Sequence, residues 1–227
     1  MNLLKNPNFQ KLYVISLLVN ISMTTFSFIL PLILYEYTKS AIAMSTMRLM
    51  DFLPNVILGM FIGVLVDRMN RRLTMLWGNV IRTLFAFSLT IVLTTTEFSL
   101  WSVYVLGFVI SSLGYMIGSA TNAIMPQLFE RSQMTEIQTR LSLQSTLVSI
   151  IGPGLLGMLL LWSSNSVFLW LFVGCNLLIV FITALLQKVP NPERSPQTRW
   201  QDLKEGYDEQ IRNKSLFIQT WTIFFSN

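Results

Sequence analysis

The stretch GVLVDRMNRRLTM, residues 63–75, places one aspartate and three arginines between two long apolar runs. Residues 43–66 form the run that leads into it, and residues 73–94 form the run that follows. Each run is long enough to cross the hydrocarbon core of a bilayer, which takes about 20 apolar residues in a helix. In a soluble protein these charges would indicate an ordinary solvated loop. Between two such runs they indicate a turn on one side of a membrane.

The composition of the whole chain agrees with this interpretation. Hydrophobic residues make up 52% of the 227 residues and charged residues only 12%, whereas soluble domains carry about 25% charged residues. The chain has no histidine and a single cysteine, Cys175, which lies within an apolar run. Because it shows no nucleophile–base pair, metal cluster or phosphate loop, we predict no enzyme activity, no cofactor and no metal. The sequence therefore predicts an all-α, polytopic membrane protein.

Six apolar stretches are long enough to span a membrane. They are residues 12–35, 43–66, 73–94, 100–125, 141–162 and 167–186. We expect the first to be retained as a span, because it lacks the cleavage site of a signal peptide. The predicted organisation is a six-helix bundle over residues 1–187, a cytoplasmic loop over 188–214 and the start of a seventh membrane helix over 215–227. Within the loop, apolar residues recur at helical spacing from Trp200 on, which predicts an amphipathic helix on the membrane surface.

The cations predict the orientation. If the N-terminus is cytoplasmic, every Lys and Arg outside the spans falls on the cytoplasmic side except Lys39, as the positive-inside rule requires. The net charge of +5 is therefore a sign of membrane topology, and we expect no nucleic-acid partner. The expected location is a cell membrane, in particular the inner membrane of a bacterium.

Three charged residues lie inside the predicted spans, where charge is costly and often functional: Arg48, Asp51 and Arg82. Arg48 and Asp51 are three residues apart and can meet on one helical face. Asp51 is either a protonation site coupled to transport or part of a structural ion pair or clamp between the second and third helices. Arg82 shares its face with Asn79 and Ala86 and is expected to face protein or water.

Polar and small residues mark further candidate positions. In the fourth span Gly107, Ser111, Gly114, Gly118 and Asn122 form a stripe that allows close helix approach. The candidate cavity-lining residues are Asn20, Thr24, Tyr115, Ser119 and Asn122.

Proline and glycine mark a second feature. SIIGPGLLGM in the fifth span contains Gly152, Pro153, Gly154 and Gly157, which predict an interrupted helix with close backbone approach. FLPNVILGM in the second span also has a proline followed by Gly-Met. Paired breaks of this kind are typical of two inverted three-helix repeats in transporters.

The opening stretch resembles the signature of the major facilitator superfamily, which lies between its second and third helices. Gly63, Asp67, Arg68, Arg71 and Arg72 match that pattern, while Asn70 stands where a second glycine is expected. GPGLL is similar to the proline-glycine motif of the superfamily's exporters, and ATNAIMPQLFERSQM and the Trp200 segment resemble its drug-efflux branch, macrolide exporters included. The fourth span lacks the arginine found there in many proton-driven drug exporters.

The resemblance covers the whole chain but corresponds to the N-terminal half of a family member. It implies a six-helix bundle that rocks against a second one, with the signature as a cytoplasmic gate. The expected function is secondary active efflux of small amphiphilic compounds, with proton coupling, in a lipid bilayer. The missing partner is a C-terminal half or a second copy. The alternatives are a metabolite or siderophore exporter of the same fold, and a truncated membrane protein that does not transport.

Overall fold

The computed structural model describes residues 5–94 and 99–187, with the backbone alone at Met60, Phe61, Gly63, Val64, Asp67 and Arg68. These residues form six long helices and a short 3-10 turn, η2, and contain no strand: α1 (Pro7–Thr38), α2 (Ala41–Arg68), α3 (Arg71–Thr94), α4 (Leu100–Leu128), η2 (Arg131–Gln133), α5 (Met134–Leu160) and α6 (Asn165–Ala184). All six have the length and apolar character of a membrane span. The six spans predicted from sequence are thus confirmed, although α5 begins two turns earlier than expected. The predicted surface helix and seventh span lie outside the described residues.

The helix ends are set by local capping. The Asn6 side chain accepts a hydrogen bond from the Asn8 amide at 3.0 Å, and Pro7 occupies the first turn of α1, where its missing N–H is not needed. Lys39 ends α1 in a left-handed conformation, φ 51°, with its amide on the Tyr35 carbonyl at 2.8 Å. Ser40 then caps α2 through the Ala43 amide. With so short a connection, α1 and α2 must run antiparallel.

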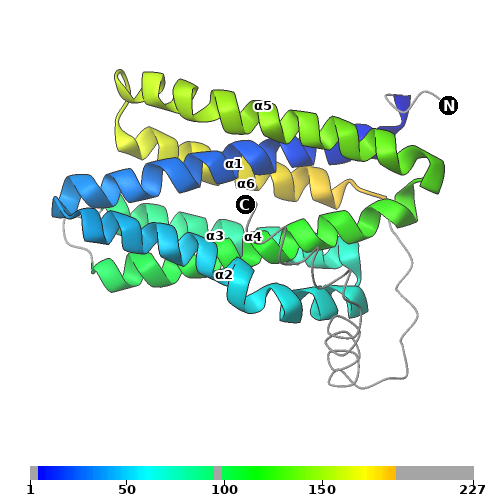
Figure 1. Ribbon diagram of the computed structural model, residues 1–227, viewed down its shortest axis with the longest axis horizontal. Helices are drawn as coiled ribbons and strands as arrows, with labels where there is room; N and C mark the ends of the chain where they lie inside the picture. Colours follow the sequence, from blue (N-terminus) through cyan, green and yellow to red (C-terminus); the bar gives the residue numbers. More distant parts are fainter. Residues whose placement is uncertain (1–4, 95–98, 188–227) are drawn as a thin grey trace, which may run out of the picture.

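Helix packing follows the symmetry of a three-helix repeat. α1 packs on α5 and α6, just as α4 packs on α2 and α3, and α3 packs on α6 across the centre. Figure 1 shows the helices running side by side along the long axis of the molecule. Exchanging α1, α2 and α3 for α4, α5 and α6 therefore maps these contacts onto one another, whereas the packing of α1 on α2 has no counterpart of similar extent between α4 and α5. The shared contacts are the pattern expected of the two repeats predicted from sequence.

The interior has two apolar clusters with a polar level between them. One cluster includes Phe26 and Leu30 of α1 and Leu89 of α3; the other includes Ile15 of α1 and Met75 of α3. The helix segments between these clusters carry most of the buried polar residues: Ser22, Thr25, Asn79, Arg82, Thr83, Ser111 and Asn176. Polar groups inside a membrane are costly in free energy, and those that are present are usually functional. A functional site is therefore expected at this level.

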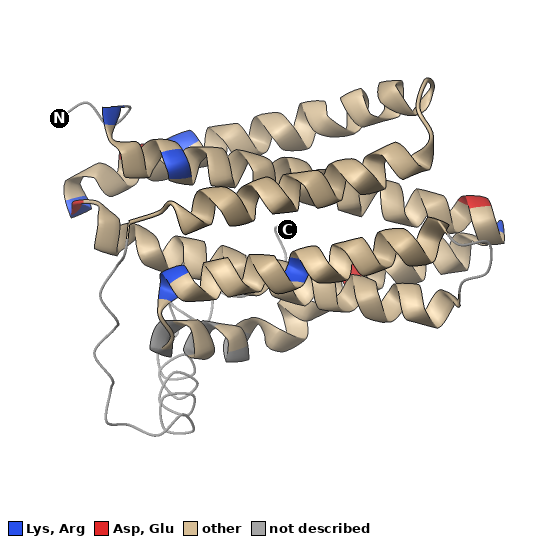
Figure 2. Ribbon diagram, turned by 180° about the vertical axis from the view of Figure 1, so that it is seen from behind, with Lys and Arg blue, Asp and Glu red and all other residues tan. Residues whose placement is uncertain are grey.

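Charges are otherwise sparse along the bundle. Figure 2 shows Lys and Arg gathered mainly toward one end of the helices. The sides of α2 and α5 carry large exposed apolar residues, among them Phe52, Ile150 and Met158, which are 58%, 71% and 68% exposed. Apolar surface of this kind is suited to lipid or to another apolar helix.

Candidate functional site

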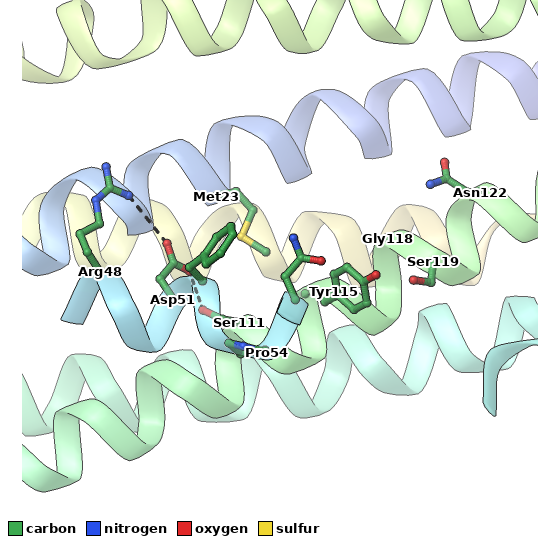
Figure 3. Close-up of a pocket in the computed structure, with 12 residues that line it drawn as sticks. Met23, Arg48, Asp51, Pro54, Ser111, Tyr115, Gly118, Ser119 and Asn122 are labelled. Carbon is green, nitrogen blue, oxygen red and sulfur yellow. Dashed lines mark hydrogen bonds and ion pairs between the residues drawn. The ribbon is translucent and has the colours of Figure 1, made fainter. Parts of the chain in front are cut away.

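A cavity of about 620 Å³ opens at the polar level, between α1, α2 and α4. Its walls are formed by Met23, Arg48, Asp51, Phe52, Pro54, Asn55, Ser111, Gly114, Tyr115, Gly118, Ser119 and Asn122. Figure 3 shows Asp51 and Ser111 at one end of the cavity and Ser119 and Asn122 toward the other. Of the predicted cavity residues, Tyr115, Ser119 and Asn122 lie here. Within the described residues, no group of His, Cys, Asp and Glu is placed to hold a metal ion.

Asp51 is the centre of the polar contacts at one end of the cavity. Its carboxylate accepts hydrogen bonds from Ser27 of α1 at 2.5 Å and from Ser111 of α4 at 2.7 Å. Arg48, more than half exposed, has Nη1 3.8 Å from the same carboxylate, so the pair expected from their spacing is present. The clamp joins α2 to α1 and α4, not to α3 as predicted. Sequence spacing revealed the pair within one helix but not the two serines.

Arg82 of α3 does not line the cavity directly; its side chain is completely buried behind the cavity wall. Nη2 donates to the Met23 Sδ at 3.1 Å, and the guanidinium lies 5.5 Å from the centre of the Phe172 ring. Nε and Nη1 have no hydrogen-bond partner among the described residues. Asn79 and Ala86 are also fully buried, so this face of α3 looks into protein, as expected.

The small residues of α4 have two different uses. A methyl group on Gly107 would overlap the Met47 side chain, and one on Gly114 would overlap Met23. These two glycines therefore permit the close packing predicted for the stripe. Gly118 differs, because a Cβ there would meet nothing within 4 Å. It leaves open space in the cavity instead of a helix contact.

Asn20 and Thr24 of α1, predicted to line the same cavity, have different surroundings in the structure. Asn20 lines a second, smaller cavity of about 240 Å³ between α1, α4 and α5, which shares Gly118 and Asn122 with the first. Thr24 is absent from the walls of both cavities. Its Cγ2 lies 3.0 Å from the position that a Cβ on Gly152 would take. The Thr24 side chain thus packs on α5, and the small size of Gly152 makes room for it.

The predicted interruption of the fifth span is wrong. α5 continues through Pro153 from Met134 to Leu160, because loss of one backbone hydrogen bond need not end a long helix. Close approach holds only at Gly152; a Cβ on Gly154 or Gly157 would meet nothing within 4 Å. The stronger change of direction is in α2, near its middle (Figure 1), where Pro54 lies.

The loop signature forms a tight turn between α2, which ends at Arg68, and α3, which begins at Arg71. The Asn70 side chain accepts a hydrogen bond from the Leu73 amide at 3.1 Å. Asparagine is among the best residues for this N-cap role. The departure from glycine at this position therefore gives α3 a cap that glycine lacks. The side chains of Asp67 and Arg68 lie outside what the structure describes.

Arg72 has a role that the sequence did not indicate. Its Nε donates to the Leu186 carbonyl at 2.9 Å and its Nη2 to the Ala184 carbonyl at 2.6 Å. Lys11 of α1 donates to the Leu185 carbonyl at 2.7 Å. Two cations from different helices thus bind the orphan carbonyls at the C-terminus of α6, where the helix dipole favours positive charge. One signature arginine is therefore a contact within the bundle.

We expect Arg72→Gln to lower the free energy of unfolding by about 1–2 kcal/mol, because charge-assisted bonds at a helix C-terminus are lost. Unfolding of the purified chain in detergent mixtures, followed by circular dichroism, measures this. Arg131→Gln, an exposed position in η2, removes the same charge as a control. Equal stability of the two variants would show that Arg72 does not hold α6.

Comparison with known proteins agrees with the architecture. The family model described as Major Facilitator Superfamily matches residues 12–227. "Macrolide efflux protein A" of Streptococcus pyogenes is 30% identical over 190 residues, which cover 81% of this chain and 46% of that protein. The protein of the same name from Enterococcus faecalis is 30% identical over 184 residues, covering 78% of this chain and 56% of the relative.

A third relative, "Putative bacilysin exporter BacE" of Bacillus subtilis (strain 168), is 32% identical over 161 residues, covering 70% of this chain and 39% of that protein. The chain spans about half the length of the curated relatives it matches. With a family model over nearly its whole length and six helices that can cross a membrane, this chain belongs to the Major Facilitator Superfamily of membrane transporters.

Proposed function

We propose that this chain is the N-terminal half of an exporter that moves small amphiphilic compounds, drugs among them, by alternating access. The observation that carries the proposal is the cavity at the polar level of the bundle. Its volume of about 620 Å³ lies within the range of small-molecule sites. The wall combines apolar Met23 and Phe52 with a few polar groups, Tyr115 and Asn122 among them, as an amphiphilic cargo requires. The names of the relatives support efflux of such compounds.

The second half of the transporter is proposed to cover the exposed apolar sides of α2 and α5. Leu49, Phe52 and Val56 of α2, and Ile150 and Leu155 of α5, are each more than half exposed. α2 also forms one wall of the cavity, so a second bundle against it would close the site on that side. The partner is a C-terminal half or a second copy of this chain.

The cytoplasmic gate is assigned to the signature residues Gly63, Asp67, Arg68 and Arg71. Their turn lies at the end of the bundle that collects most Lys and Arg (Figure 2), which supports a cytoplasmic N-terminus by the positive-inside rule. Asp51 is the proposed proton-coupling group, because its carboxylate lies at the polar level beside the cavity. Export of a metabolite is the second candidate, favoured by the relative named for a bacilysin exporter.

The test blocks the cavity without disturbing helix packing. In the complete transporter, Gly118→Leu places a side chain in open cavity space, because a Cβ there meets nothing within 4 Å. We expect cells with this variant to accumulate a radiolabelled macrolide to the level of cells lacking the transporter, and wild-type cells to accumulate several-fold less.

Gly174→Leu in α6 is the matched control, because a Cβ there also meets nothing within 4 Å and Gly174 lines neither described cavity. This variant should export like the wild type. If the wild-type transporter lowered the accumulation of neither macrolides nor any other tested amphiphile, the proposal of efflux would be contradicted. Full export by the membrane-inserted Gly118→Leu variant would show that the cargo does not use this cavity.

A further inference from the structure

Arg82 lies directly behind one wall of the cavity described above. Its guanidinium carbon is 3.7 Å from the position of a Cβ on Gly114, and its Nη2 bonds to Met23; both Gly114 and Met23 line the cavity. Figure 3 shows the Met23 side chain between α1 and the Asp51 end of the cavity. Only a thioether and a glycine therefore separate a buried cation from the cavity.

Among the described residues, two arginines but only one carboxylate lie in or directly behind the cavity wall: Arg48, Arg82 and Asp51. Arg48 and Asp51 pair at 3.8 Å, and Asp51 is also held by Ser27 and Ser111. Arg82 has a thioether sulfur and the face of an aromatic ring as its neighbours. Asp51 attracts it through charge but makes no hydrogen bond to it, and two of its nitrogens have no hydrogen-bond partner in the described part of the chain. A sulfur is a weak acceptor, so the strong acceptor that a buried guanidinium needs is not supplied.

The cover over Arg82 is suited to moving. Methionine is unbranched, has three rotatable side-chain bonds and adapts to irregular space. The Met23 methyl occupies the volume that a side chain at position 114 would fill, which is available because the residue is glycine. Rotation of Met23 toward the cavity would expose Nη2 without moving a helix.

We propose that Arg82 is an anion subsite of the cavity, covered by Met23, which binds the carboxylate of an amphiphilic ligand when Met23 rotates away. Guanidinium–carboxylate pairing is planar and often bidentate, and Nη1 and Nη2 are the two donors that would make it. The inference rests on the proposed transport function, since it uses the same cavity, and narrows its cargo to compounds with an acidic group beside an apolar body.

Equilibrium dialysis of the purified full chain in lipid nanodiscs tests the subsite directly. The probes are radiolabelled benzoate and benzamide, which have the same shape but differ in charge. Met23→Ala should raise the affinity for benzoate about tenfold, a gain typical of one exposed charge-assisted bond, and should change the affinity for benzamide far less. Arg82→Met and the double variant Met23→Ala/Arg82→Met should lose the preference for benzoate.

Met47→Ala is the matched control, because Met47 packs on Gly107 in the apolar cluster away from the cavity wall; it should bind like the wild type. An equal gain for benzoate and benzamide in Met23→Ala would overturn the subsite, since added space alone would explain it. So would benzoate binding that survives Arg82→Met. If the affinity for benzoate rose strongly in Asp51→Asn and not in Met23→Ala, the group that competes with the ligand for Arg82 would be Asp51, and the role proposed for Met23 would be wrong.

The outcome is independent of the transport assay. Benzoate binding that depends on Arg82 in a protein that exports nothing would leave the subsite standing and remove the transport function. Export that the Gly118→Leu variant blocks, without Arg82-dependent benzoate binding, would remove the subsite alone.

Discussion

Asp51→Asn is expected to reduce export by the complete transporter about tenfold or more, a loss of at least about 1.4 kcal/mol in transition-state stabilisation, while the protein stays folded. The asparagine side chain has the same shape, and its amide can still bond with the hydroxyls of Ser27 and Ser111. Only the negative charge and the proton it binds are lost. Initial rates of macrolide export from energised membrane vesicles, with the amount of inserted protein measured in parallel, check the result.

The two hypotheses for Asp51 predict different outcomes. If the carboxylate is only a clamp between α1, α2 and α4, Asp51→Asn retains export, and Asp51→Ala lowers the free energy of unfolding because two hydroxyls and Arg48 lose their partner. If the charge couples transport to protons, both variants lose export, but only the alanine variant also loses stability. Normal export by Asp51→Asn would reject proton coupling through this residue.

The spans were predictable because a bilayer leaves the backbone few choices. A chain in hydrocarbon must satisfy its own N–H and C=O groups, so an apolar run of about 20 residues is a helix with little ambiguity. The pair between Arg48 and Asp51 was also predictable, since both residues lie on one helix at a fixed spacing. These features depend on local sequence alone.

The contacts between helices were not predictable in the same way. The Ser27 and Ser111 hydroxyls reach Asp51 from 24 and 60 residues away, and their positions depend on how three helices pack. Thr24 and Asn20 share one helix and a similar spacing, yet the first packs on Gly152 and the second lines a cavity. The rotation of α1 about its own axis determines which neighbour each side chain meets, and this rotation cannot be inferred from the composition of the helix.

Arg72 shows the same limit within a recognised motif. The spacing of the signature identified the turn, but the carbonyls that Arg72 binds belong to α6, 112 and 114 residues away. The resemblance assigns all the signature residues to a gate, whereas in the structure two residues of the turn make contacts within the bundle. Arg72 and Asn70 stabilise the bundle, and the proposal of a gate rests on the other signature residues, Gly63, Asp67, Arg68 and Arg71.

Arg82→Met is expected to stabilise the bundle by about 1–4 kcal/mol, although it removes a fully buried and extensively packed side chain. Methionine has similar length, fills the same space beside Phe172 and requires no counter-ion. A buried ion carries a desolvation penalty of several kcal/mol, and this penalty is poorly offset where two guanidinium nitrogens have no hydrogen-bond partner in the described residues. The free energy of unfolding in detergent mixtures measures it.

Two further variants show whether charge is the cause. Arg82→Ala should be less stable than Arg82→Met by about 2 kcal/mol or more, because it leaves a void. Arg48→Met should gain nothing, since Arg48 is 56% exposed and pairs with Asp51. If Arg82→Met is instead the less stable protein, the guanidinium already has its counter-charge in the resting state and no free subsite exists. If it is more stable, the bundle carries a costly cation at its polar level that packing does not require, which is expected of a residue kept for binding.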